Sequence, residues 1–187
     1  MLTKRDKEIL KFIEDYKSLT IKQAQHLFFN GTYEGARRRL AELEKFGLLK
    51  SAISKGRSEK VYFDGKNLSD HDLYKIDYIA NLKKMEFEIL EFNSKPSYFN
   101  NKLKPDALVI CRKNGYRYIT FLEVDYTHYT DNIKLKTLYE KLAREEFKET
   151  GFILVVARPT PGIRYSPSEY DIVFTDLEFN NLSTYIY

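Results

Sequence analysis

The chain has 187 residues, of which 43% are apolar, 31% charged and 15% aromatic. This composition is typical of a globular protein and excludes a disordered or fibrous one, because those classes lack so much Tyr and Phe. A single cysteine excludes a disulfide framework and a Cys-rich zinc site. No apolar run reaches the ~20 residues of a membrane span. The N-terminus continues into mixed charge and not into an apolar leader core, so we expect a cytoplasmic protein without a membrane partner.

Positive charge is concentrated in the first third of the chain. Residues 1–66 carry 15 Lys and Arg against 9 Asp and Glu, a net charge of +6, whereas residues 67–187 carry 16 against 18, a net charge of −2. A basic segment beside a mildly acidic one indicates that the first binds a polyanion and that the second has another task. We therefore predict two domains, 1–66 and 67–187, joined by a polar stretch that contains Gly65.

Three short helices are predicted in the first 47 residues. Thr3 with Asp6, and Thr20 with Gln23, have the spacing of capping boxes, in which two residues three apart satisfy each other's backbone N–H groups. Apolar residues at helical spacing follow each cap. The third helix is expected to end at Gly47, since glycine is favoured just past a helix C-terminus.

A hairpin with a basic turn is predicted next, with strands over 48–53 and 60–63. Three helices followed by a hairpin is the order of a winged helix-turn-helix, whose recognition helix enters the major groove of double-stranded DNA. The expected DNA contacts are Arg37, Arg38 and Arg39 on the third helix, with Lys55, Arg57 and Lys60 on the wing. The alternatives are an ordinary solvated face and a winged helix that serves protein contacts or dimerisation.

The remaining residues predict an α/β domain, so the fold class of the whole chain is mixed α and β. The expected elements are a helix from 71, strands over 87–92, 104–111 and 118–125, a helix that contains Ile133 and Leu135, a buried strand over 152–157 and a strand over 172–174. Asn114-Gly115 predicts a hairpin turn between the second and third strands. The basic loop 158–164 is expected at the surface.

Three carboxylates converge in this domain. Glu123 and Asp125 are two residues apart and leave the same face of one strand, and the hairpin brings Asp106 close to Glu123. Because such carboxylates repel one another, they favour a hard divalent cation, Mg²⁺ or Mn²⁺, which could activate water for phosphodiester cleavage. The alternative is that the carboxylates cap strand ends or pair with nearby lysines such as Lys134 and Lys136.

A family resemblance rests on the same residues. Pro105-Asp106, then Glu123-Val124-Asp125 across a hairpin, then a helix and an apolar strand, resembles the PD-(D/E)XK restriction-endonuclease fold. With a winged helix in front and His71-Asp72-Leu73 at the start of the second domain, nearly the full chain resembles the replication-relaxation family of plasmids and other mobile elements. That family is in turn similar to the restriction-endonuclease-fold relaxases.

The resemblance implies plasmid replication, DNA relaxation or mobilisation, with Mg²⁺-dependent nicking by the second domain. Asp106 and Glu123 would be metal ligands, joined by Asp125. The chain departs from the pattern at Asp125, where the motif has Lys, and Lys136 or Lys134 of the following helix is expected to supply that charge. The alternative is a non-catalytic regulator or accessory factor with a degenerate nuclease domain. A homodimer is a further expectation.

Overall fold

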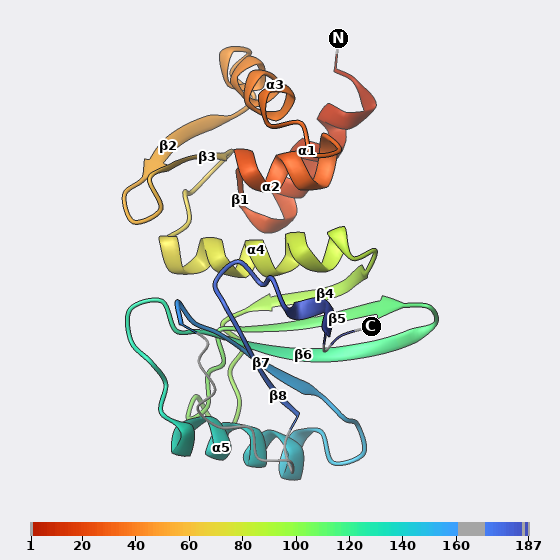
Figure 1. Cartoon of the computed structure of the whole chain (residues 1–187), viewed down its shortest axis with the longest axis vertical. Coiled ribbons are helices and arrows are strands. Elements are labelled where there is room, and N and C mark those ends of the chain that lie inside the picture. The colour runs from red at the N-terminus through yellow and green to blue at the C-terminus, as the bar shows by residue number, and fades with distance from the viewer. Residues whose placement is uncertain (1, 161–170, 185, 187) are drawn as a thin grey trace. The chain divides into compact units, whose positions relative to one another are not determined.

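The computed structural model describes residues 2–160, 171–184 and 186. The chain is a mixed α and β protein that divides into two compact units, Met1–Ala80 (unit 1) and Asn81–Tyr187 (unit 2) (Figure 1). Unit 1 extends past the boundary expected after residue 66, because it includes most of helix α4 (Asp70–Lys84). Asp77 of that helix accepts a hydrogen bond from Gln23 at 2.7 Å. Among the described residues, no helix is long and apolar enough to cross a membrane.

Unit 1 begins with three helices: α1 (Lys4–Tyr16), α2 (Ile21–Phe28) and α3 (Tyr33–Lys45). Both predicted capping boxes are confirmed, since the hydroxyls of Thr3 and Thr20 accept from the N–H groups of Asp6 and Gln23, each at 3.2 Å. The return bonds to the Thr3 and Thr20 N–H groups measure 2.6 and 2.9 Å. Gly47 follows α3 with a φ of +72°, a left-handed conformation that favours glycine.

The small sheet of unit 1 has the strand order β1–β3–β2, all antiparallel. Its strands are β1 (Ser18–Thr20), β2 (Lys50–Ser54) and β3 (Glu59–Phe63). Strand β1 was not predicted from the sequence, because it is three residues long and exists through pairing with a distant segment, with Leu19 opposite Tyr62. Ile9 and Leu40 of the helices and Val61 of β3 are fully buried.

Unit 2 is built on a five-stranded mixed sheet with the order β4–β5–β6–β7–β8. Its strands are β4 (Glu88–Ser94), β5 (Ala107–Lys113), β6 (Tyr116–Val124), β7 (Ile153–Ala157) and β8 (Ile172–Thr175). The first three strands are antiparallel, whereas β7 runs parallel to β6 and β8 parallel to β7. Asn114 and Gly115 have φ values of 51° and 82°, which fits the predicted two-residue turn.

Helix α5 (Asn132–Lys141) and the π-helical turn η1 (Leu142–Glu146) connect β6 to β7 and cover one face of the sheet (Figure 1). Leu135 and Leu138 pack there against apolar residues of the strands. Ile133, predicted for the apolar stripe of this helix, is instead 80% exposed. At 3.6 residues per turn it lies well away from the side that Leu135 and Leu138 turn to the sheet.

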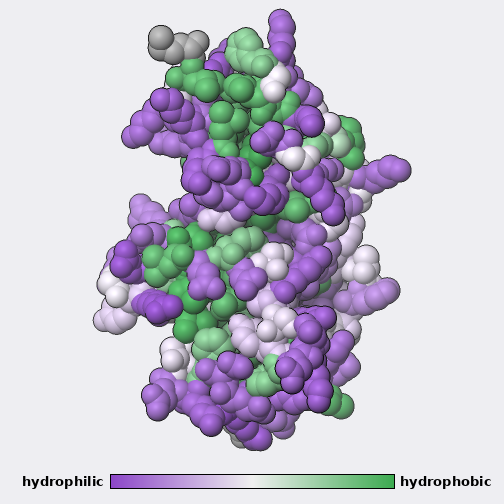
Figure 2. Space-filling model, turned by 180° about the vertical axis from the view of Figure 1, so that it is seen from behind, coloured by the Kyte–Doolittle hydropathy of each residue, from purple (hydrophilic) through white to green (hydrophobic). Residues whose placement is uncertain are grey.

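The opposite face of the sheet is also buried. Val109, Leu122 and Val155 lie on it, because side chains alternate along a strand, and none of the three is accessible to solvent. The C-terminal 3-10 helix η2 (Leu182–Thr184) lies on that side (Figure 1). Hydrophilic residues dominate the surface in Figure 2. The large apolar side chains exposed among the described residues are Tyr33, Phe46, Leu48, Ile53, Leu90, Tyr116, Tyr129 and Ile133.

Candidate functional site

Asp106 and Glu123 lie close together at one end of the β5–β6 pair. Asp106 directly precedes β5, and the paired register ends with Ala107 opposite Leu122, the residue before Glu123 in β6. The charge of Asp106 is near enough to raise the pKa of Glu123. Glu123 projects from the face that α5 covers, because Phe121, two residues before it on β6, belongs to the core beneath that helix.

The position of Asp106 is fixed by the strands on both sides of it. Its Oδ2 accepts a hydrogen bond from the N–H of Val124 at 2.8 Å. Its own N–H donates to the carbonyl of Leu122 at 3.0 Å, and its carbonyl accepts from the N–H of Lys95 at 2.8 Å. The carboxylate is therefore held against the end of β6, where Glu123 also projects.

Glu123 is held in an environment that disfavours its negative charge. Burial, followed by the nearby charges of Asp106 and Asp125, raises the pKa of Glu123 to about 8. A hydrogen bond with the backbone of Asp106 and the positive charge of Lys134 only partly offset this rise. Glu123 is therefore mostly protonated at neutral pH, and a bound cation would favour the ionised form.

The two candidate lysines of α5 differ in their surroundings. Lys134 lies in the first turn of the helix, and its charge lowers the pKa of Glu123. The Lys136 ammonium lies 3.8 Å from Glu140, one turn along the same helix. The charge of Lys134 thus acts on Glu123.

Asp125 has both carboxylate oxygens engaged in a buried ion pair that the sequence did not indicate. Its Oδ2 lies 2.6 Å from Nε of Arg158, and its Oδ1 accepts from the Thr130 hydroxyl at 2.7 Å. Asp125 and Arg158 are each only 3% exposed. The expectation that Arg158 belongs to a surface loop is therefore wrong, and residues 161–164 of that loop lie outside the described residues.

The strand topology of unit 2 explains this ion pair. Asp125 directly follows β6 and Arg158 directly follows β7, and these strands are parallel neighbours. The carboxyl ends of parallel neighbours meet at one edge of a sheet, so two opposite charges at those positions are brought together. Asp125 therefore forms an ion pair with Arg158. Its role as a metal ligand stays a prediction.

The donor set formed by Asp106 and Glu123 suits a hard divalent cation. In the described part of the chain, no group of three or more His, Cys, Asp or Glu side chains is arranged to hold a metal ion. Mg²⁺, however, is commonly held by one or two carboxylates together with waters and substrate phosphates. Two neighbouring carboxyl groups, with the pKa of Glu123 raised by burial and then by the charges of Asp106 and Asp125, fit Mg²⁺ or Mn²⁺ on these grounds.

In unit 1, Arg39 of α3 is engaged within the fold. Its Nε and Nη2 lie 2.7 and 2.6 Å from the two carboxylate oxygens of Asp6, which is fully buried. Its Nη1 also contacts Glu42. This pairing holds the pKa of Asp6 well below its usual range. Arg39 therefore ties α3 to the cap of α1, and a major-groove contact by Arg39 would require this pair to open.

The predicted wing is tied to the start of α4. Arg57 is largely buried, contacts Asp77 and Glu59 at 2.6 Å each, and lies over the Tyr74 ring at 4.7 Å. Asp70 accepts a hydrogen bond from the N–H of Gly56 at 2.9 Å. The hairpin is thus held in place by carboxylates of the same unit, and the positive charge of Arg57 is largely balanced there.

The other predicted DNA contacts are more open to solvent. Lys60 is about one-third exposed and lies 2.7 Å from Glu44. Arg37 is exposed and forms a surface pair with Glu34 at 2.8 Å, which is a weak interaction at such a site. Arg38 and Lys55 are exposed. Of the three α3 arginines, Arg39 is held against α1 and Arg37 pairs with Glu34. Arg38 is therefore the one best placed to contact a partner.

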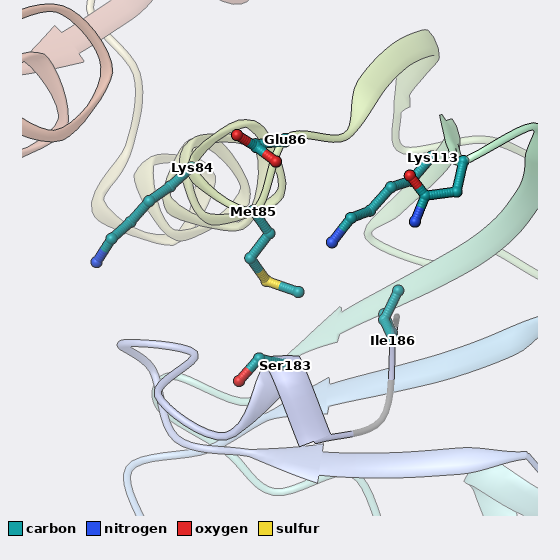
Figure 3. A pocket seen from close by; sticks show the side chains of 7 residues that line it. Lys84, Met85, Glu86, Lys113, Ser183 and Ile186 are labelled. Carbon is teal, nitrogen blue, oxygen red and sulfur yellow. The ribbon is translucent and has the colours of Figure 1, made fainter.

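A separate pocket of about 400 Å³ lies in unit 2. It is lined by Lys84, Met85, Glu86, Lys113, Asn114, Ser183 and Ile186. Figure 3 shows Met85 and Lys113 extending into the space between α4 and the β5–β6 turn. None of the predicted site residues lines it, so the pocket is distinct from the carboxylate pair.

Comparison with known proteins adds no assignment. No family model matches this chain, and no curated protein matches it.

Proposed function

We propose that this chain is a DNA-binding protein whose second domain nicks DNA with the help of Mg²⁺ or Mn²⁺. The observation that carries the proposal is the pair of neighbouring carboxyl groups, Asp106 and Glu123, at the end of β6. Burial, followed by the charges of Asp106 and Asp125, raises the pKa of Glu123, and the charge of Lys134 partly offsets this rise. Such a pKa shift combined with a specific charge partner is typical of functional sites.

The element order of unit 1 supports a winged helix. Its elements follow the order α1–β1–α2–α3–β2–β3, and its sheet has the order β1–β3–β2. This arrangement is consistent with three helices followed by a hairpin wing. The second helix of the helix-turn-helix would be α3, whose exposed side carries Arg38. The basic charge of residues 1–66 agrees with a polyanionic partner.

The topology of unit 2 supports a restriction-endonuclease-like domain. An antiparallel β4–β5–β6 meander, a crossover through α5 and the parallel strand β7 agree with the resemblance that Asp106 and Glu123 first indicated. Membership of the replication-relaxation family, a cytoplasmic location, a homodimer and action in plasmid replication or mobilisation are part of this proposal.

The side chains have distinct tasks in the proposed reaction. A bound Mg²⁺ would supply Lewis acidity, polarising a phosphate oxygen and lowering the pKa of a water. Asp106, oriented by the N–H of Val124, and Glu123 would hold that ion. Lys134 would balance the negative charge that develops on the phosphate. Arg158 would keep the adjoining loop in place through Asp125.

The non-catalytic reading is favoured by one observation. Asp125 stands where the motif has a Lys that would act on the phosphate. Its negative charge is balanced by Arg158 in an ion pair. A protein that retained the scaffold but lost cleavage would bind DNA through unit 1 and act as a regulator or accessory factor.

Nicking of supercoiled plasmid separates the two readings. We expect Mg²⁺-dependent or Mn²⁺-dependent nicking by the full chain, and a decrease of about 100-fold or more for Asp106→Asn, since a lost metal site forfeits several kcal/mol of transition-state stabilisation. Glu91→Gln, an exposed carboxylate change on β4, is the matched control. If nicking is absent on several plasmids while DNA binding is intact, the regulator is the correct reading.

The arginines of α3 give a second prediction. We expect Arg38→Ala to weaken duplex binding by about tenfold and to reduce the salt dependence by about one phosphate contact, with no change in stability. Arg39→Ala should instead lower the free energy of unfolding by about 2 kcal/mol, because Asp6 loses its partner. Fluorescence anisotropy and urea denaturation measure the two effects. If Arg39→Ala weakened DNA binding as much as Arg38→Ala and left the free energy of unfolding unchanged, these separate roles of Arg38 and Arg39 would be contradicted.

A further inference from the structure

Tyr129 is an aromatic side chain held rigidly and yet left half open to solvent. The residue is 44% exposed. The guanidinium of Arg158 lies over the ring with Cζ 5.2 Å from its centre. The Tyr129 hydroxyl is hydrogen-bonded to the hydroxyl of Thr160. Two contacts thus hold the ring in place, and Tyr129 is still partly open to solvent.

The arginine behind this ring is itself fixed. Arg158 is bonded to Asp125 at 2.6 Å and donates from Nη2 to the carbonyl of Thr130, also at 2.6 Å. The Arg158 guanidinium also lies over the Phe174 ring, with Cζ 4.9 Å from its centre. The Tyr129 ring thus rests on a buried, charge-balanced support, so it loses little freedom when a flat ligand stacks on it.

Tyr129 is also linked to the site formed by Asp106 and Glu123. Arg158 joins it directly to Asp125, whose charge helps to raise the pKa of Glu123. The loop that carries Tyr129 leads from the end of β6 into α5, whose first turn supplies Lys134. A strand whose phosphate is held at Asp106 and Glu123 would have its neighbouring nucleotides within reach of this ring.

We propose that Tyr129 is a stacking platform for an unpaired base, so that unit 2 takes a single-stranded or locally unwound DNA strand. This inference rests on the proposed function. A base in an intact duplex has both faces covered by its neighbours, whereas an unpaired base can stack on an aromatic ring. Stacking of this kind accepts any base. It therefore selects unpaired strands over duplex DNA but does not select a base sequence.

The test uses single-stranded oligonucleotides that carry 2-aminopurine, whose fluorescence falls when the base stacks. The full chain is mixed with the oligonucleotide in Mg²⁺, and fluorescence is recorded before any product forms. We expect quenching with the natural chain and with Tyr129→Phe, loss of quenching with Tyr129→Ala, and about tenfold weaker single-strand binding for the alanine variant. Duplex affinity should stay the same in all three.

Ile133→Ala is the matched control, because Ile133 is an exposed apolar side chain that lies away from the sheet side of α5. It should leave quenching unchanged. Equal quenching by Tyr129→Ala, or no quenching by a natural chain that anisotropy shows to be bound, overturns the stacking platform and leaves the nicking proposal standing. Absence of binding to both single strands and duplex overturns the proposed function and this inference together.

Discussion

Replacement of Arg158 by Ala is expected to lower the free energy of unfolding of unit 2 by about 3–5 kcal/mol, the range found when one partner of a buried ion pair is removed. Asp125 is 3% exposed, and its Oδ2 would lose the partner that lies 2.6 Å away. The Thr130 hydroxyl alone cannot balance a buried carboxylate charge. The rings of Tyr129 and Phe174 would also lose the guanidinium that each contacts.

Urea denaturation followed by circular dichroism measures this effect. Arg112→Ala is the matched control, since Arg112 pairs with Glu88 at 2.7 Å but both side chains are more than half exposed, and such a pair contributes at most about 1 kcal/mol. The double change Asp125→Asn with Arg158→Met should recover more than half of the loss, because it removes both charges. A cost for Arg158→Ala no larger than that for Arg112→Ala would show that the pair contributes little.

Features that depend on nearby residues were predictable from the sequence. The capping boxes at Thr3 and Thr20 each involve residues three apart, and both are present. The turn at Asn114-Gly115 follows from the preference of these residues for positive φ. In each case the side chains that decide the geometry are neighbours in the chain, so composition and spacing suffice.

Features that depend on distant residues were not predictable. Arg39 with Asp6, and Arg158 with Asp125, are both pairs separated by 33 residues. The sequence shows that an arginine is present but not which carboxylate the fold brings to it. For the same reason Arg39 was assigned to DNA with its neighbours on α3, and Arg158 to a surface loop. The proximity of Asp106 and Glu123 was predictable, because a two-residue hairpin turn fixes the register of the strands that it joins.

Glu123→Gln is expected to stabilise the chain at high pH in the absence of metal. Burial and the charges of Asp106 and Asp125 raise the pKa of Glu123 from 4.5 to about 8. Between these values the folded chain holds a proton that the unfolded chain has released, so the contribution of Glu123 to stability falls as pH rises from about 4.5 to about 8. Glutamine lacks this dependence. After allowance for solvent screening, we expect a gain of about 2–3 kcal/mol at pH 8.5 and little at pH 5.

The same variant should respond to Mg²⁺ in the opposite way, because a cation at this site must displace the proton of Glu123. Added Mg²⁺ should stabilise the natural chain more at pH 8 than at pH 6, and it should leave Glu123→Gln nearly unaffected. Thermal melting in EDTA and in Mg²⁺ at the two pH values measures both trends, with Glu91→Gln as the control. Parallel pH profiles for the natural chain and Glu123→Gln in EDTA would show that Glu123 is ionised at neutral pH. An equal Mg²⁺ effect on both would place the cation elsewhere on the molecule.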